Sequence, residues 1–109
     1  MLFSIIIPVF NAEHSIRKCI DSILNQAFLD FEVLLINDGS TDDTEKILTE
    51  YSCKDSSIKV FNFPNSGVGI SRRRGISLAQ GQYVIFVDAD DSINPELLQK
   101  LATPISSYA

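Results

Sequence analysis

The sequence predicts an α/β domain with three layers, α/β/α, built around a doubly wound and mainly parallel sheet. Four apolar runs of strand character alternate with segments whose apolar residues recur at the helical period. The runs are nearly continuous, which is typical of parallel strands that helices cover on both faces. With 109 residues, 45% of them hydrophobic, the chain suffices for one domain over residues 1–109.

The four strands are predicted from β-branched and aromatic runs that turn residues separate. They are expected at residues 3–7, 32–36, 58–63 and 83–87. Pro8 ends the first run, because proline has no N–H to give to a sheet. Right-handed crossovers between such strands lead to the doubly wound topology.

The helices between the strands have start and stop signals of their own. They are expected at about 13–26, after the capping-box pattern of 40–43, at about 67–79 and at about 95–102. Asn11 is the candidate N-cap of the first helix. Gly81 is the candidate left-handed residue that closes the third.

The net charge and the two cysteines limit the classes of protein to which this chain can belong. A net charge of −5 argues against a nucleic-acid surface, since the only basic cluster is 72–74. Neither a signal peptide nor a membrane span is evident, so we expect a cytoplasmic protein. A peripheral position of the full-length protein at the inner face of the membrane is a separate expectation. Cys19 and Cys53 are expected to be two unpaired, buried thiols.

Polar residues gather where each predicted strand ends. The segments are 8–13, 37–40, 65–67 and 88–91. Ligands of a doubly wound sheet bind outside the carboxyl ends of its strands. Each segment alone could be a solvated turn, but their convergence favours a binding site.

Asp88-Ala89-Asp90-Asp91 follows the last apolar run directly. Three carboxylates crowded at a strand tip repel one another and are costly to desolvate, and a divalent cation removes both problems. Mg²⁺ is typically held by one or two carboxylates together with substrate phosphates. The segment therefore indicates a place where a metal and a phosphorylated ligand meet. The alternative is an acidic turn that caps the following helix.

Other candidate residues also have two interpretations. Asp38 can accept a hydrogen bond from a base or a ribose, or it can form an Asx-turn. Phe10 can cover a base or belong to the core, and Glu13 can simply favour a helix dipole. Arg72 lies beside the stripe predicted to face the sheet and can turn back toward a phosphate, or it can be solvated with its neighbours. That stripe consists of Val68, Ser71, Gly75, Leu78 and Ala79.

Four linked motifs resemble those of the family 2 glycosyltransferases of the GT-A fold. They span 4–13, 36–42, 65–67 with Ser71-Arg72, and 86–91, so the resemblance covers essentially the whole chain. Arg73 departs from the pattern, because the family often has asparagine there. The resemblance implies the Rossmann-like half of a GT-A fold that binds a nucleotide-diphospho-sugar, most often a UDP-sugar, with Mn²⁺ or Mg²⁺.

The resemblance also implies how individual residues act. Asp38 would bind uracil, and Arg72 would lie near the base or the diphosphate. Asp88 would contact the ribose or the sugar, Asp90 would ligate the metal, and Asp91 would support them. The residues expected at the nucleotide sugar are Pro8, Val9, Phe10, Glu13, Asp38, Gly67, Arg72, Asp88, Ala89 and Asp90.

Family members that resemble this chain continue well past residue 91, and the continuation supplies the acceptor site and a general base. We therefore expect no catalytic residue within residues 1–109 and no activity from them alone. The parent enzyme would transfer sugar with inversion to a saccharide or lipid-linked acceptor, in cell-envelope polysaccharide synthesis. The alternative is a non-catalytic nucleotide-binding or interaction module, which could associate with itself through a truncated sheet edge.

Two other classes of protein fit the sequence less well. A phospho-receiver domain needs an acidic pair after the first strand, where this chain has Pro8 and a single Glu13. A nucleotidyltransferase needs a glycine-rich, basic loop at the same place, and residues 8–11 are not one.

Overall fold

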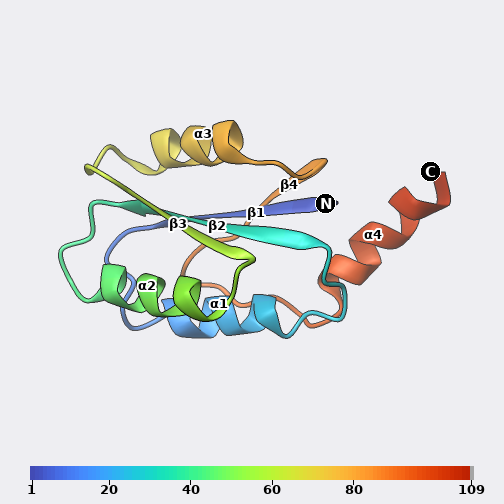
Figure 1. The fold of residues 1–109 in the computed structure, drawn as a ribbon, viewed down its shortest axis with the longest axis horizontal. Coiled ribbons are helices and arrows are strands. Elements are labelled where there is room, and N and C mark those ends of the chain that lie inside the picture. Colours follow the sequence, from blue (N-terminus) through green and yellow to red (C-terminus); the bar gives the residue numbers. More distant parts are fainter. Residues whose placement is uncertain (109) are drawn as a thin grey trace.

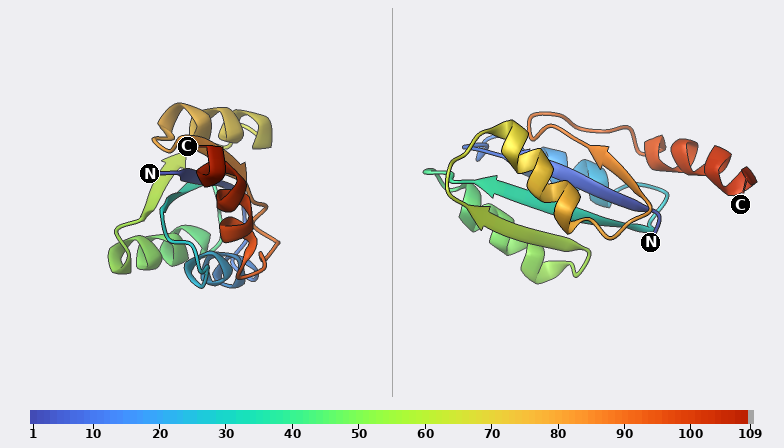
Figure 2. Two further views of the ribbon diagram at one scale, coloured as in Figure 1. Left: turned by 90° about the vertical axis from the view of Figure 1, so that its right-hand side faces the viewer. Right: turned by 90° about the horizontal axis from the view of Figure 1, so that it is seen from above.

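The computed structural model describes the backbone of residues 1–108 and the side chains up to residue 105. Four parallel strands form one sheet in the order β3-β2-β1-β4 (Figure 1). Helices α1 and α2 cover one face of the sheet and α3 covers the other (Figure 2). The predicted three-layer α/β class is confirmed. The elements are β1 (Phe3–Val9), α1 (Ile16–Leu24), β2 (Phe31–Asp38), α2 (Thr44–Lys54), β3 (Ile58–Phe63), α3 (Val68–Leu78), β4 (Tyr83–Phe86) and α4 (Leu97–Tyr108).

Alternate residues of β1 enter two separate hydrophobic clusters. Ile5 and Ile7 pack with Ile20 of α1 in the larger cluster, and all three side chains are fully buried. Ile6 points to the opposite face, where it meets Leu34 under α3. Burying such a side chain contributes about 1.5–3 kcal/mol. Both faces of the central strands are therefore apolar, as the continuous runs predicted.

A buried carboxylate fastens the amino-terminal end of the sheet. Glu32 is 1% exposed and accepts hydrogen bonds from the Ser4 hydroxyl at 2.6 Å and the Gln80 N–H at 2.7 Å. Lys59 Nζ lies 3.0 Å from its other oxygen. The Gly81 N–H donates to Ser4 Oγ at 2.8 Å. This Glu32 clamp joins β1, β2 and β3 to the connection between α3 and β4.

Helix α3 lies close to the sheet because Gly75 faces Ile6. A Cβ at Gly75 would lie 2.4 Å from Ile6 Cγ2, whereas a Cβ at Gly69 on the same helix would meet nothing within 4 Å. We expect Gly75→Ala to lower the free energy of unfolding by about 1–2 kcal/mol through overpacking, while Gly69→Ala raises it by about 0.5–1 kcal/mol. Urea denaturation of the two variants measures both. Equal effects at the two positions would contradict the close approach.

Two predictions about the first strand and helix are wrong. Pro8 does not end β1, which continues to Val9, because the ladder with β4 stops at Ile6 and the missing N–H of Pro8 has no partner to lose there. Asn11 does not cap α1, which begins at Ile16 after Ser15. Asn11 instead adopts a φ of +47° between the strand and the helix.

Predictions at the other end of the chain also need correction. Gly81 has no positive φ; a Cβ there would lie 2.6 Å from the Phe3 carbonyl carbon, so close packing explains the glycine. Helix α4 begins at Leu97 and continues through Pro104, beyond the predicted 95–102. Val84 and Phe86 of β4 are exposed, so helices do not cover this strand on both faces within the described residues.

Candidate functional site

A cavity of about 240 Å³ opens at the carboxyl ends of β1 and β2, next to the first turn of α3. It brings together five of the ten residues predicted from the sequence for the nucleotide sugar: Pro8, Val9, Phe10, Asp38 and Gly67. Asn65, Val68 and Ser71 complete its lining. The position agrees with the rule that ligands of such sheets bind beyond the strand ends.

Asp38 forms the polar wall of the cavity. It is the last residue of β2 and only 4% exposed. One carboxylate oxygen accepts the Ser66 N–H at 2.7 Å, and the other accepts the Gly67 N–H at 2.9 Å and Asn65 Nδ2 at 3.4 Å. A carboxylate offers about four acceptor sites, so one site stays available to a ligand. The Asp38 side chain thus holds the loop before α3 instead of forming the alternative Asx-turn in the loop after β2.

The rest of the cavity is largely apolar. Phe10 is 51% exposed at its rim, and Val68 is 54% exposed, although the helical stripe placed Val68 against the sheet. Ser71 and Gly75 do lie buried against the sheet, as the stripe predicted. The Ser71 hydroxyl has no hydrogen-bond partner among the described residues. Apolar walls with a few fixed polar groups are typical of small-molecule sites.

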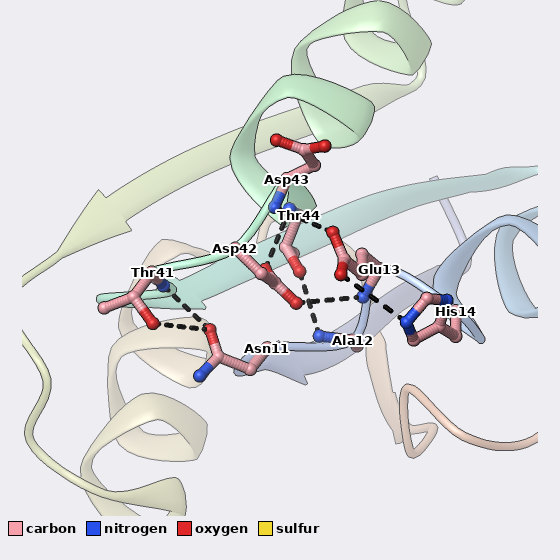
Figure 3. A network of polar contacts seen from close by, with 8 residues as sticks. All are labelled: Asn11, Ala12, Glu13, His14, Thr41, Asp42, Asp43 and Thr44. Atoms are coloured by element: carbon pink, nitrogen blue, oxygen red, sulfur yellow. Dashed lines mark hydrogen bonds and ion pairs between the residues drawn. The ribbon is translucent and has the colours of Figure 1, made fainter.

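The loops after β1 and β2 hold each other by reciprocal hydrogen bonds (Figure 3). Glu13 accepts the Asp43 N–H at 3.0 Å, and Asp42 accepts the Glu13 N–H at 3.4 Å and the Thr44 N–H at 2.9 Å. The Ala12 N–H donates to Thr44 Oγ1 at 2.9 Å. Burial raises the pKa of Asp42, but the hydrogen bonds from Thr44 and Glu13 outweigh it and hold that pKa below its usual value. Glu13 therefore lies in this loop contact, outside the cavity lining.

The same contact replaces the capping box predicted at 40–43. Asp43 is the N-cap of α2 and makes no side-chain cap bond. Glu13 of the neighbouring loop accepts the N–H of Asp43, and Asp42 accepts the N–H of Thr44, the first residue of the helix. Ser40 donates its hydroxyl to Asn37 at 2.6 Å. Glu13, which is distant in the sequence, thus accepts the Asp43 N–H that the capping-box pattern assigned to Ser40.

Arg72, Asp88, Ala89 and Asp90 lie outside the cavity lining, in or near the turn after β4. Arg72 Nη2 is 3.9 Å from an oxygen of Asp88, whose side chain is 69% exposed. The Arg72 guanidinium also lies over the Phe86 ring, 5.9 Å from its centroid. Arg74 on the other flank is only partly exposed, and its guanidinium lies over the Phe63 ring, 4.2 Å from its centroid. Arg72 is thus turned toward the acidic turn, as a phosphate-binding arginine would need to be.

The acidic turn at residues 88–91 is the metal site expected from the sequence. Over residues 1–108, no three histidine, cysteine or acidic side chains gather closely enough to hold a metal ion, so the expected carboxylate trio does not form. Asp90 accepts the Ser15 hydroxyl at 3.1 Å and is exposed. One accessible carboxylate fits Mn²⁺ or Mg²⁺ when substrate phosphates complete the coordination. Asp90 is therefore the residue of this turn that could hold such an ion together with substrate phosphates.

The two cysteines differ from each other. Cys19 is fully buried, and its thiol lies 3.5 Å from the Asp88 carbonyl. Burial, and then the nearby Asp91, Asp88 and Asp90, raise the pKa of Cys19 to about 11, so the thiol stays neutral. Cys53 is exposed, which corrects the expectation of two buried thiols, and neither cysteine forms a disulfide.

Asn65, Val68 and Ser71 line the cavity but are not among the ten residues predicted for the nucleotide sugar. The signal for the last two was present, because positions 68 and 71 fall in the first turn of α3, directly after the Asn65–Gly67 turn. Residues on the inner face of a first helical turn lie at the sheet end as well as against the sheet. The helical stripe at 68–79 predicts packing against the sheet, but its period gives no sign that its first turn also lines a cavity.

Residues 4–109 match the profile of glycosyl transferase family 2. The chain belongs to this family. The Bacillus subtilis uncharacterized glycosyltransferase EpsJ is 41% identical over 100 residues, and the Escherichia coli uncharacterized glycosyltransferase YibD is 39% identical over 100 residues. Each alignment covers 92% of this chain and 29% of the relative. This family 2 chain thus spans less than a third of the length of these curated relatives.

Solved structures agree with the family. Residues 1–349 of S. aureus TarS, crystallised with UDP-GlcNAc, superpose with a TM-score of 0.92 and 39% identity over 98% of this chain and 32% of that crystallised chain. Glucosyl-3-phosphoglycerate synthase from Mycobacterium tuberculosis, crystallised with Mn²⁺ and UDP, gives a TM-score of 0.74 and 28% identity over 95% of this chain and 39% of that enzyme. The fold of the family 2 chain is that of GT-A glycosyltransferases. Over residues 1–108, no helix has the length and apolar character needed to cross a membrane.

Proposed function

We propose that this chain binds the UDP-sugar donor of an inverting, metal-dependent glycosyltransferase. The cavity between Phe10 and Asp38 carries the proposal, because it offers a flat apolar wall and one acceptor site where a nucleobase of this family would lie. The choice of uridine is supported by two structural relatives, one crystallised with UDP-GlcNAc and the other with UDP. The sugar acceptor, a saccharide or a lipid-linked saccharide, belongs to the same proposal.

Two regions of the site would bind different parts of the donor. The free acceptor site of Asp38 would take the N–H of a uracil, and Phe10 would cover the ring. Arg72 of α3 lies 3.9 Å from Asp88 of the acidic turn, where the diphosphate and the sugar would lie. Held by Asp90, Mn²⁺ or Mg²⁺ would neutralise the charge of the departing nucleoside diphosphate.

Calorimetry of UDP binding tests the proposal. We expect UDP to bind in the presence of Mn²⁺ and its affinity to fall at least about tenfold in a chelator, since the bridging charge is lost. Asp90→Asn should remove this difference. Asp30→Asn, an exposed aspartate at the opposite end of the sheet, is the matched control and should retain it. Binding that is equal with and without metal would contradict the assignment of Asp90.

The exposed edge of β4 favours a second candidate function, an interaction module. Val84 and Phe86 are 38% and 44% exposed on the edge strand, and an open edge with apolar side chains can pair with another chain. Sedimentation and nucleotide titration distinguish the two functions. Self-association without any nucleotide binding would favour the interaction module over the donor site.

A further inference from the structure

Asn11 directly follows Phe10 at the point where the chain leaves β1, and its backbone conformation is unusual. Its φ of +47° lies in the left-handed region, which asparagine tolerates better than most residues with a side chain. It is the only residue other than glycine with a positive φ in the described chain. The turn occurs directly after Phe10, whose ring stands half exposed at the rim of the cavity.

Three hydrogen bonds tie Asn11 to the loop after β2, one of them a donation from the Thr41 hydroxyl to the Asn11 side-chain oxygen at 3.4 Å. Its side-chain oxygen accepts the Thr41 N–H at 2.7 Å (Figure 3), and its own N–H donates to Ser40 Oγ at 3.0 Å. Ser40 is fixed in turn, because its hydroxyl donates to Asn37, which is 3% exposed. Asn37 donates to Asn62 of β3 at 2.9 Å. A chain of polar contacts therefore runs from the backbone beside Phe10 across the ends of β2 and β3.

We propose that Asn11 is a positioning residue that acts on the nucleotide through Phe10. An exposed aromatic ring loses side-chain freedom when a base stacks on it, and a backbone that already fixes the ring reduces this loss. Asn11 itself does not line the cavity. The inference rests on the proposed function, since it requires that Phe10 covers the base of the donor.

Three substitutions at Asn11 separate its backbone conformation from its hydrogen bond. Asn11→Ala loses the Thr41 contact and disfavours the positive φ, and we expect it to weaken UDP binding about five- to tenfold. Asn11→Gly keeps the conformation without the contact and should have an intermediate effect. Asn11→Asp keeps an acceptor and tolerates the conformation, so it should restore affinity to within about twofold of the wild type. Asn25→Ala is the control, since Asn25 is exposed and its side chain makes no hydrogen bond to any side chain or backbone group within residues 1–105.

A double-mutant cycle with Phe10→Ala tests whether Asn11 acts through the ring. UDP affinity is measured by calorimetry in the full-length chain, and thermal unfolding of each variant confirms that it is folded. If the proposal holds, Asn11→Ala weakens binding in the wild-type background and has no further effect once Phe10 is alanine. Additive effects, or an Asn11→Ala variant with wild-type affinity, would overturn it. Failure of the proposed function is distinct, because the wild-type chain itself would then not bind UDP.

Discussion

Glu32→Ala is expected to lower the free energy of unfolding by about 3–5 kcal/mol, because it leaves buried donors of the Glu32 clamp without an acceptor. For a chain of this size, the melting temperature should fall by roughly 15 °C or more. Urea and thermal denaturation measure the loss. Glu45→Ala, on an exposed position of α2, is the control and should change stability by about 0.5 kcal/mol. A loss at Glu32 no larger than at Glu45 would show that the clamp is not stabilising.

The Glu32 clamp also predicts how stability depends on pH. Burial raises the pKa of Glu32, but hydrogen bonds from Ser4, Gln80 and Lys59 outweigh it and hold the pKa below the usual 4.5. The unfolded chain therefore binds this proton first as the pH falls. The contribution of Glu32 is complete above pH 4.5 and is lost as the pH falls through the lower pKa of the folded state. Glu32→Gln should be less stable at neutral pH and should lose less on acidification.

Asp38→Ala is the second substitution with a large expected effect, and it acts on both stability and binding. The Ser66 and Gly67 N–H groups lose their acceptor, which should lower the free energy of unfolding by about 2–4 kcal/mol. The cavity loses its polar wall and the anchor of the loop before α3. We therefore expect UDP affinity to fall at least about 100-fold. Calorimetry and urea denaturation measure the two effects.

Asp38→Asn distinguishes contact with the base from support of the loop. Uracil presents an N–H at N3, whereas cytosine presents an acceptor there. If Asp38 touches the base, its amide variant should lose affinity for UDP and gain affinity for CDP relative to UDP. If Asp38 only holds the loop, both nucleotides should weaken equally.

Much of the fold could be predicted because a strand that is buried on both faces needs a nearly continuous apolar run, which is visible in its own sequence. The strand over 58–63 has the predicted ends, and the apolar runs at β1 and β2 are buried on both faces. The caps could not be predicted, since local patterns do not reveal tertiary partners. The oxygen of Asn11 accepts an N–H that lies 30 residues away, and Gly81 is required by the nearby backbone of Phe3.

The candidate site was predicted in part for a similar reason. Pro8, Phe10, Asp38 and Gly67 meet in one cavity because all of them lie at the carboxyl ends of parallel strands or at the start of the next helix. That rule gives no information on where a side chain turns. It could not show that Glu13 would serve the neighbouring loop.

The position of β1 has a consequence for synthesis of the chain on the ribosome. The strand made first, Phe3–Val9, lies inside the sheet, and its β4 partners at 83–86 are made much later. At ordinary translation speed the interval is roughly 4 to 15 seconds. Throughout it, the side of β1 that β4 will occupy is an unpaired row of backbone groups flanked by isoleucines. The nascent chain is therefore most exposed to wrong pairing before residue 86 emerges, and slower translation of α3 would prolong that exposure.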